Sequence, residues 1–400
     1  MTSWLAHGSE TLPWRQTQRA GTRDDRMMTE VAATIPPHIA ALSCEPSLDI
    51  VRDSERALLA AAVADTAAEG HSAALSRFML RTESVASSKI ERIEASAEDF
   101  ARAIAGGRGN GSATSMVAAS VALHTLVRDA GESGVITIDG MLAAHRALME
   151  EDEYEARYAG RVRDMQNWIG GSDHSPRGAL HVPPAPERIP ELLEDLVAYL
   201  NRDDVPVLVQ AAIAHAQFES IHPFTDGNGR IGRALISAVL WRRGVTANTV
   251  IPLASGILAR RDDYFDALTT YRSGDPTDII RLIAAATRVA AVEARVSIGQ
   301  LSLLPDEWHA EMDTRRGSAI FNLIPAFFDH PVMTSEDAER LSGSGESQTF
   351  KALDRLAGAG IIREITGRKR GRVWVAADLI AELDDLDRRI QAAMRRTRVA

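Results

Sequence analysis

Apolar side chains recur every three or four residues over most of this chain, which is the spacing of one face of an α-helix. The pattern is clear from Ala74 to Phe100, where it predicts one or two amphipathic helices. It predicts further helices over residues 51–70, 116–130, 139–150, 187–201, 204–220, 231–243, 261–272 and 276–298. We therefore expect a mainly α-helical bundle for the first 300 residues.

Four segments depart from this spacing. Residues 1–29 are polar and unpatterned, and we expect a mobile tail there. Pro36 and Pro37 block a helix and favour an extended arm. Short runs that flank a turn rich in Gly, Ser, Asp and Pro predict one β-hairpin over residues 162–182. The Gly-rich stretch 106–112 has no strand before it, so we interpret it as a linker rather than a phosphate-binding loop.

The C-terminal part shows another order of elements. A short helix that begins at Thr334 or Ser335 is followed by a turn and by a second helix closed by Gly358 and Gly360. Two short strands come next, around a basic turn. A helix–turn–helix followed by a hairpin is typical of a winged-helix domain. A charged helix ends the chain.

We therefore divide the chain beyond residue 29 into three parts. They are an N-terminal helical region over 30–110, a helical core over 111–300 and a winged-helix domain with its terminal helix over 301–400. Several cations would lie on the wing: Arg363, Arg368, Lys369, Arg370 and Arg372. They would either touch DNA phosphates or be solvated, and the second helix, with Gln348, Thr349 and Lys351, would enter a groove. Winged helices also bind proteins, so the pattern leaves both partners open.

Composition adds limits rather than a function. The 400 residues carry a net charge of −10, which argues against a protein that coats nucleic acid along its whole length. Cys44 is the only cysteine, which excludes an internal disulfide and fits a reducing compartment. There is no basic start before an apolar run, and no apolar stretch of membrane-spanning length. We expect a cytoplasmic protein without a membrane partner.

The sequence IHPFTDGNGRIGRAL, between two predicted helices, holds the candidate chemistry. A calcium loop with Gly229 at position six would place Asp226 and Asn228 at ligand positions three and five. Positions one and twelve would then be Phe224 and Leu235, where an acid and a bidentate glutamate are needed. This excludes the calcium loop. A plain interhelical turn remains an alternative, because Asp-Gly-Asn-Gly is a common turn composition.

A turn alone explains neither the histidine nor the arginines. Arg230 and Arg233 share a face at the start of a helix, where cations oppose the helix dipole, so a functional reason is expected. Free N–H groups at that helix start form an anion cradle, and guanidinium groups match phosphate oxygens. Asp226 can supply one carboxylate to Mg²⁺, and His222 can accept a proton from an attacking hydroxyl. Together these groups predict a nucleoside triphosphate site.

The segment HPFTDGNGR with Arg233 resembles the signature of Fic-domain proteins, His-Pro-Phe-x-Asp/Glu-Gly-Asn-Gly/Lys-Arg-x-x-Arg, at every specified position. The segments IPPHIA, IGG…PP and RRDDYFDAL are also similar, so the resemblance covers roughly residues 30–295. It implies a Fic helical bundle with one β-hairpin flap. It also implies transfer of AMP from ATP to a Ser, Thr or Tyr hydroxyl of a target protein, which docks on the 162–182 hairpin by strand addition.

The resemblance also implies a role for each position. His222 would be the general base and Asp226 the Mg²⁺ ligand. The nucleotide would be held by Gly227, Asn228 and Gly229 at the α- and β-phosphates, by Arg230 at the β/γ end and by Arg233 at the γ-phosphate. Members that act as kinases tend to carry Lys at the position of Gly229, so this chain is expected to be a nucleotidyltransferase. A tyrosine, Tyr264 or Tyr271, could lie against adenine or pack in the core.

Fic proteins are often self-inhibited by a helix with the pattern Ser/Thr-x-x-x-Glu-Gly/Asn. The segment SSKIER supplies Ser87 and Glu91, and the resemblance implies that Glu91 pairs with Arg233 in place of the γ-phosphate. Arg92 departs from the pattern, which puts the helix end and the strength of inhibition in question. A solvated helix face is the alternative for Glu91.

Two functions from different classes follow. The first is a Mg²⁺- and ATP-dependent protein adenylyltransferase. The alternative is a DNA-binding transcription regulator whose Fic core senses a nucleotide or is vestigial. The intact motif favours the enzyme. A homodimer is compatible with the sequence but not required by it. The histidines His145, His181 and His215 lack metal-binding spacing and are expected to be surface or core residues.

Overall fold

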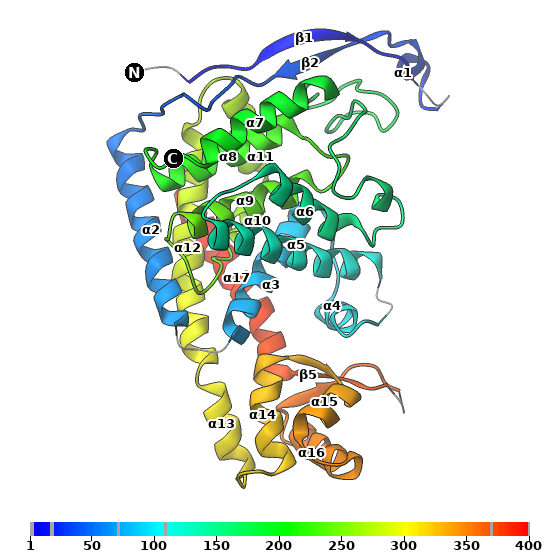
Figure 1. Ribbon diagram of the computed structural model, residues 1–400, viewed down its shortest axis with the longest axis vertical. Helices are drawn as coiled ribbons and strands as arrows, with labels where there is room; N and C mark the ends of the chain where they lie inside the picture. Colours follow the sequence, from blue (N-terminus) through cyan, green and yellow to red (C-terminus); the bar gives the residue numbers. More distant parts are fainter. Residues whose placement is uncertain (1–3, 17–19, 70–72, 108–109, 369–370, 399–400) are drawn as a thin grey trace.

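The computed structural model describes residues 4–16, 20–69, 73–107, 110–368 and 371–398. Most of these residues are helical, as the apolar spacing predicts (Figure 1). The helices before the motif are α2 (Leu48–Ala68), α3 (Ala73–Ile90), α4 (Ala97–Ile104), α5 (Gly111–Ser133), α6 (Ile138–Met149), α7 (Ile189–Leu200) and α8 (Val207–Ile221), with 3-10 turns η1 (Ala156–Tyr158) and η2 (Pro186–Arg188). Those after it are α9 (Asn228–Arg242), α10 (Ala254–Ala259), α11 (Arg261–Arg272) and α12 (Thr277–Leu301).

Helices α8 and α9 form the centre of the bundle. Nearly every residue of both is buried, from Leu208 to Ile221 and from Asn228 to Leu240. A helix that is covered on all sides needs no polar face, and apolar residues therefore occur around its whole circumference. The two helices are antiparallel neighbours joined by the motif loop, so the loop is anchored at both ends in the core.

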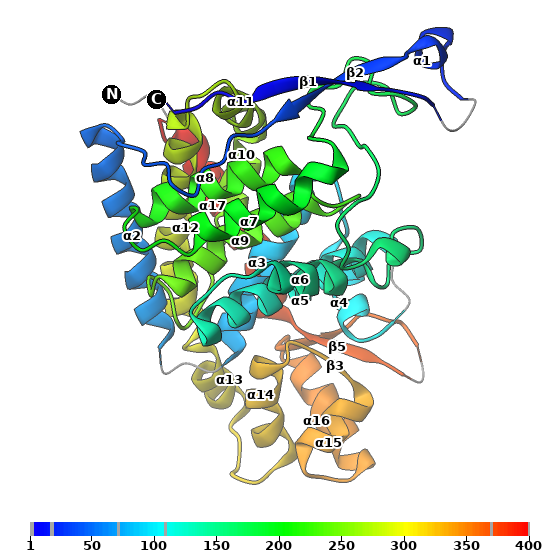
Figure 2. The ribbon, with the colours of Figure 1, turned by 45° about the horizontal axis from the view of Figure 1, so that its top comes forward.

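The N-terminal region differs from the prediction. Strand β1 (Gly8–Pro13) pairs antiparallel with β2 (Glu30–Ile35), and a short helix, α1 (Arg23–Met27), lies between them. The hairpin extends across one end of the molecule (Figure 2). The expectation of a mobile tail over residues 1–29 is therefore wrong for this strand and helix, whereas residues 1–3 and 17–19 lie outside the described residues. The error arose because β1 is largely exposed and has no apolar face to detect.

The predicted β-hairpin over 162–182 forms only in part. Its described residues contain a single bridge, between Ile169 and His181, and otherwise turns and loop. Side chains take the place of the ladder: Gln166 donates from Nε2 to the Pro183 carbonyl at 2.8 Å. Strand β2 contacts the C-terminal end of this segment, where the Thr34 amide donates to the Val182 carbonyl at 2.9 Å. The expected flap is a loop braced by the N-terminal hairpin.

The C-terminal elements from Ser335 onward follow the predicted order, and two helices and a strand that were not expected precede them. In chain order, the elements are α13 (Leu304–Met312), α14 (Ala319–Asp329), β3 (Val332–Thr334), α15 (Ser335–Ser342), α16 (Glu346–Gly358), β4 (Ile362–Glu364), β5 (Val373–Ala376) and α17 (Ala377–Arg396). The strands form one antiparallel sheet in the order β3-β5-β4. Thr334 caps α15 by a capping box with Asp337, as its sequence indicates. The winged-helix assignment and the domain boundaries remain predictions.

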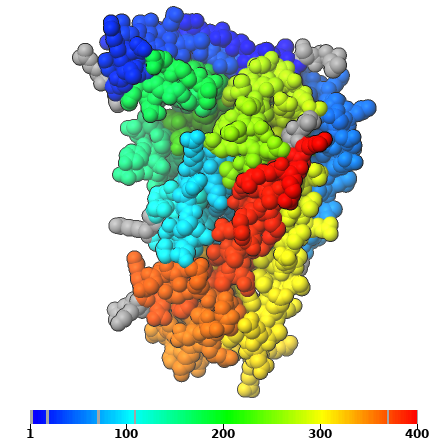
Figure 3. Space-filling model, turned by 180° about the vertical axis from the view of Figure 1, so that it is seen from behind, coloured from blue at the N-terminus to red at the C-terminus, as the bar shows by residue number. Residues whose placement is uncertain are grey.

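The terminal helix α17 leaves this sheet and lies along the helical core. Figure 3 shows it in red beside the yellow end of the core. Arg389 on α17 donates from Nε to Glu293 of α12 at 3.2 Å, and Arg260 donates to the Thr397 carbonyl at 2.6 Å. The last helix therefore ties the C-terminal sheet to the core. In the described part of the chain, no helix is long and apolar enough to cross a membrane.

Candidate nucleotide site

His222 ends helix α8 in the left-handed conformation. Its φ is +50°, its amide donates to the Phe218 carbonyl at 2.8 Å, and its own carbonyl accepts from Arg163 Nε at 2.9 Å. A non-glycine residue adopts this conformation only when its surroundings enforce it. Arg163 provides that enforcement, because it is 3% exposed and also donates to the Pro184 carbonyl at 2.7 Å. No local pattern points to this role, because Arg163 precedes His222 by 59 residues.

The loop after His222 is closed by its own asparagine. The Phe224 amide donates to Asn228 Oδ1 at 2.8 Å, and Asn228 Nδ2 donates back to the Phe224 carbonyl at 2.9 Å. The Phe224 ring is buried and stacks on His145 at a centroid distance of 3.8 Å, so it anchors the loop in the core. His145 Nε2 lies 3.2 Å from the Asp226 carbonyl. The Asn228 side chain thus orders the loop, and the phosphate contact that the resemblance implies for this residue stays a prediction.

Helix α9 begins with its amides available to a ligand. Gly227 is the N-cap, with φ of +75°, and no side chain caps the helix. A Cβ atom at Gly227 would also come too close to Leu148, so both the positive φ and the lack of space favour glycine at this position. The uncapped N–H groups and the helix dipole together favour an anion at this position. The geometry supports the anion cradle that the sequence predicts.

The two arginines are fixed by helices outside the motif. Arg230 Nη1 donates to Ser115 Oγ of α5 at 2.7 Å, and its Nη2 lies 3.4 Å from Asp226 Oδ2. Arg233 Nε donates to Ser87 Oγ of α3 at 2.9 Å, and its Nη2 donates to the Ser87 carbonyl at 2.8 Å. Both arginines are nearly inaccessible, so their direction is set by these partners.

Glu91 is a further partner of Arg233, whose Nη1 stays without a hydrogen-bond partner among the described residues. Its Oε1 lies 3.0 Å from Arg233 Nη2 and close to Gly229, where an added Cβ would collide with it. Burial opposes the charge of Arg233, but Glu91, Tyr264 and Glu219 outweigh this effect and hold its pKa above the usual value. The carboxylate therefore lies at the start of α9, on the arginine that is predicted to hold the γ-phosphate.

The structure shows how the end of helix α3 accommodates Arg92. Helix α3 ends at Ile90, and Arg92 adopts the left-handed conformation with φ of +61°. The Ile93 amide donates to the Ser88 carbonyl at 3.1 Å, as in a Schellman end. The family's glycine or asparagine suits this conformation, whereas arginine takes it at a cost.

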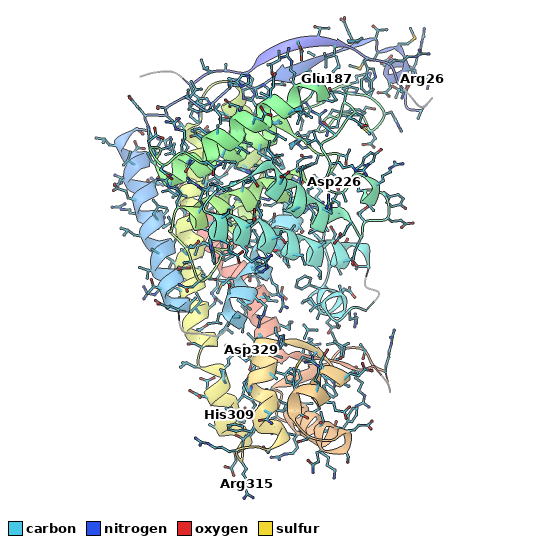
Figure 4. The ribbon with its side chains drawn as sticks, viewed as in Figure 1. Arg26, Glu187, Asp226, His309, Arg315 and Asp329 are labelled. Atoms are coloured by element: carbon cyan, nitrogen blue, oxygen red, sulfur yellow. The ribbon has the colours of Figure 1, made fainter. Side chains whose placement is uncertain are left out.

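Asp226 is the most accessible polar group of the motif, with 58% of its side chain exposed. Its Oδ1 accepts from the Gly227 amide at 2.6 Å (Figure 4 labels Asp226). Among the described residues, no group of three or more His, Cys, Asp or Glu side chains could hold a metal. Mg²⁺ often takes one carboxylate and completes its shell with water and phosphate oxygens, so Asp226 fits a metal that arrives with the nucleotide.

The protonation states of the buried groups are set mainly by burial. Burial, with Arg163 and Arg272, lowers the pKa of His222 to about 3, although the Glu219 backbone partly opposes this. His222 is therefore neutral at pH 7 and able to accept a proton. Burial also raises the pKa of Glu219 to about 7, although the positive charge of Arg233 opposes this. Glu219 is not among the predicted site residues, because its neighbours on α8 are core residues and no motif includes it.

Other predicted candidates lie in the core. Tyr264 is 1% exposed and its hydroxyl lies 3.0 Å from His215 Nε2, which favours the core-packing alternative, and its contact with adenine stays a prediction. Tyr271 is also a core residue. The histidines His145, His181 and His215 are buried, as the core interpretation expected.

The structure also shows which of the candidate DNA-binding residues in the C-terminal part are exposed. Thr349 is 1% exposed and lies 2.7 Å from Ser342 Oγ, so it is unavailable to a groove, in contrast to the exposed Gln348 and Lys351. On the wing, Arg363 pairs with Glu98 of α4. Arg372 lies over the Trp374 ring at 6.0 Å, Arg368 is exposed, and Lys369 and Arg370 fall outside the described residues.

Fold and site together define a class: a helical protein with an anion-binding helix start beside a neutral histidine. Residues 135–240 of this chain match the Fic/DOC family. This stretch contains the whole motif and the loop that braces it.

Relatives with curated names agree with this family. Protein adenylyltransferase fic-1 of Caenorhabditis elegans is 32% identical over 157 residues, which are 38% of this chain and 27% of the relative. Protein adenylyltransferase Fic of Nematostella vectensis is 34% identical over 159 residues, 39% of this chain and 33% of the relative. The chain thus spans a third or less of the length of these relatives. Among solved structures, a Fic family protein from Desulfovibrio desulfuricans G20 has 21% identity and a TM-score of 0.49, with 83% of this chain and 98% of that chain covered.

Proposed function

We propose that this protein transfers AMP from ATP to a hydroxyl group of a target protein. The observation that carries the proposal is the motif loop, which places neutral His222 beside an uncapped helix start with Arg230 and Arg233. The relatives named protein adenylyltransferase support the same reaction.

In the proposed reaction, a target hydroxyl oxygen attacks the α-phosphorus and the bond to the β-phosphate oxygen breaks, so that pyrophosphate leaves. His222 accepts the hydroxyl proton. The amides from Gly227 to Gly229 would hold the α- and β-phosphates, and the two arginines would hold the negative charge at the far end. Mg²⁺ on Asp226 would neutralise charge on the leaving pyrophosphate. Polyphosphate near His222 would also raise the pKa of its imidazole and make it a better base.

Self-inhibition by Glu91 is part of the proposal. Its carboxylate accepts from Arg233 and lies against Gly229, so it competes with the terminal phosphate for the same donor. Ser87 keeps Arg233 in place when Glu91 leaves, because it holds Nε and Nη2 independently.

The test is labelling of a cell lysate with Mg²⁺ and ATP that carries the label on either the α- or the γ-phosphate. We expect α-label on protein, little with wild type, more with Glu91→Gly and none with Glu91→Gly combined with His222→Ala. Label from γ-labelled ATP would indicate a kinase instead. If no variant transfers α-label while ATP still binds, the proposal is wrong. Asp226→Asn should shift the Mg²⁺ concentration needed for half-maximal labelling upward.

The target is proposed to dock at residues 162–182, which carry the exposed Met165 and Leu180 and include Arg163, the donor to the His222 carbonyl. We place the reaction in the cytoplasm, where ATP and Mg²⁺ are available. Homodimer formation stays a prediction, which sedimentation would decide.

DNA binding is the second candidate. The order α15, α16, β4, β5 and the exposed cations Lys351, Arg355 and Arg368 favour it. Phosphate contacts predict a steep loss of DNA affinity with salt, so a gel shift with the upstream DNA across a salt series tests this candidate. Binding that is absent at low salt would exclude it for that DNA.

A further inference from the structure

A groove away from the nucleotide site lies between α3, α4 and α5, three helices that lie close together above α14 (Figure 1). It encloses about 410 Å³, within the range of small-molecule sites. Its walls are apolar: Leu80 from α3, Phe100 and Ile104 from α4, and Val117 and Val121 from α5. No residue of the motif lines it, so the groove requires its own explanation.

The groove is elongated. A second hollow of about 280 Å³ shares Ser76, Leu80 and His124 with the first and continues toward Trp241 and Val250. An apolar path that runs on from one hollow into the next suits a chain-shaped molecule better than a compact one.

One end of the apolar groove carries a positive charge without a counter-ion. Arg77 and Arg81 both line it from α3. Arg77 has partners, since its Nη2 donates to the Asp329 carbonyl at 2.6 Å and lies 4.0 Å from the Asp329 carboxylate. Arg81 forms no hydrogen bond or ion pair with any described residue. Burial, followed by repulsion from Arg77, lowers the pKa of Arg81 to about 10, so it remains charged at pH 7.

A charge in an apolar surrounding is costly unless an opposite charge accompanies it. The lining of the first hollow offers no carboxylate, and Glu132 in the second hollow lies 3.9 Å from Arg128, with which it pairs. Burial and Arg128 lower the pKa of His124. An anion would therefore complement Arg81, and the apolar walls favour an anion that brings apolar surface with it.

We propose that this groove binds a small amphipathic anion, a molecule with one acidic head group that pairs with Arg81 and an apolar chain that lies along Leu80, Phe100 and Val121. The site belongs to the two helices that fix the motif arginines, since α3 carries Ser87 and α5 carries Ser115. It depends on neither ATP binding nor AMP transfer.

The test uses decanoate as the probe and the full-length protein, by calorimetry at pH 7. We expect saturable decanoate binding, and binding of decanol, which has the same chain without the charge, at least about tenfold weaker. Arg81→Met removes the charge but keeps the length, and should weaken decanoate about tenfold with little effect on decanol.

A second pair of variants controls for folding and for unspecific adsorption. Val121 lines the groove and is 50% exposed, and Val292 on α12 is 51% exposed and does not line it. Val121→Glu places a negative charge in the groove and should abolish decanoate binding, whereas Val292→Glu should leave it unchanged. Three results would each overturn the proposal: no saturable decanoate binding, equal affinity in wild type and Arg81→Met, or equal losses in the two glutamate variants.

Discussion

Removal of the Glu91 carboxylate should tighten ATP binding. Glu91→Gly deletes the group that lies 3.0 Å from Arg233 Nη2 and collides with any added atom on Gly229. Ser87 still holds Arg233 after the change, so the arginine keeps its direction and gains a free donor. ATP then no longer has to displace a carboxylate before it binds.

The size of the effect follows from the exposure of the pair. A hydrogen bond to a charged group contributes about 1.5–3 kcal/mol when buried, and a fully exposed ion pair about 0–1 kcal/mol. Arg233 is 1% exposed and Glu91 is 37% exposed, so the pair lies between these limits. We take about 1–2 kcal/mol, which corresponds to a Kd for ATP about 5- to 30-fold lower in Glu91→Gly.

Calorimetric titration with ATP and Mg²⁺ measures this directly. Glu91→Gln should give an intermediate Kd, because the amide still accepts a hydrogen bond but carries no charge. Glu94→Gly, an exposed position three residues further on, is the matched control and should leave the Kd unchanged. If Glu91→Gly and wild type agree within about twofold, the carboxylate does not compete with ATP and the inhibitory assignment is refuted.

Three further predictions concern the surroundings of the site. Lys89→Met removes the partner that lies 3.0 Å from the Asp387 carboxylate and leaves this carboxylate buried and unpaired. The free energy of unfolding, measured by urea titration, should fall by about 1–3 kcal/mol, and the double variant with Asp387→Leu should regain most of this loss. Arg92→Gly relieves the left-handed residue after α3 and should raise the melting temperature by an amount equivalent to about 1 kcal/mol, whereas Arg92→Ala should give no gain. Burial raises the pKa of Glu83 from 4.5 to about 8, so between these values the folded state holds a proton that the unfolded state has lost. The free energy of unfolding should therefore fall as pH rises from about 5 to 8. An equally steep fall in a Glu83→Gln variant would contradict this.

The sequence by itself determined the features that depend on near neighbours. Helix α11 was predicted to the residue at Arg261–Arg272, because apolar spacing along a helix is a local property. The same holds for the capping box at Thr334. The motif from His222 to Arg233 is also local, since one loop and one helix turn bring its groups together.

Only the tertiary structure decided which distant groups meet. Arg163 holds the His222 carbonyl across 59 positions of sequence, and Thr34 of β2, far away in the sequence, braces the loop at Val182. Tyr264 was a plausible ligand contact by residue type, but its neighbours bury it. The unpaired charge of Arg81 is likewise invisible in the sequence, because pairing and burial depend on which helices pack together. Local spacing fixes what a segment becomes, whereas exposure and partnership are properties of the surroundings that folding creates.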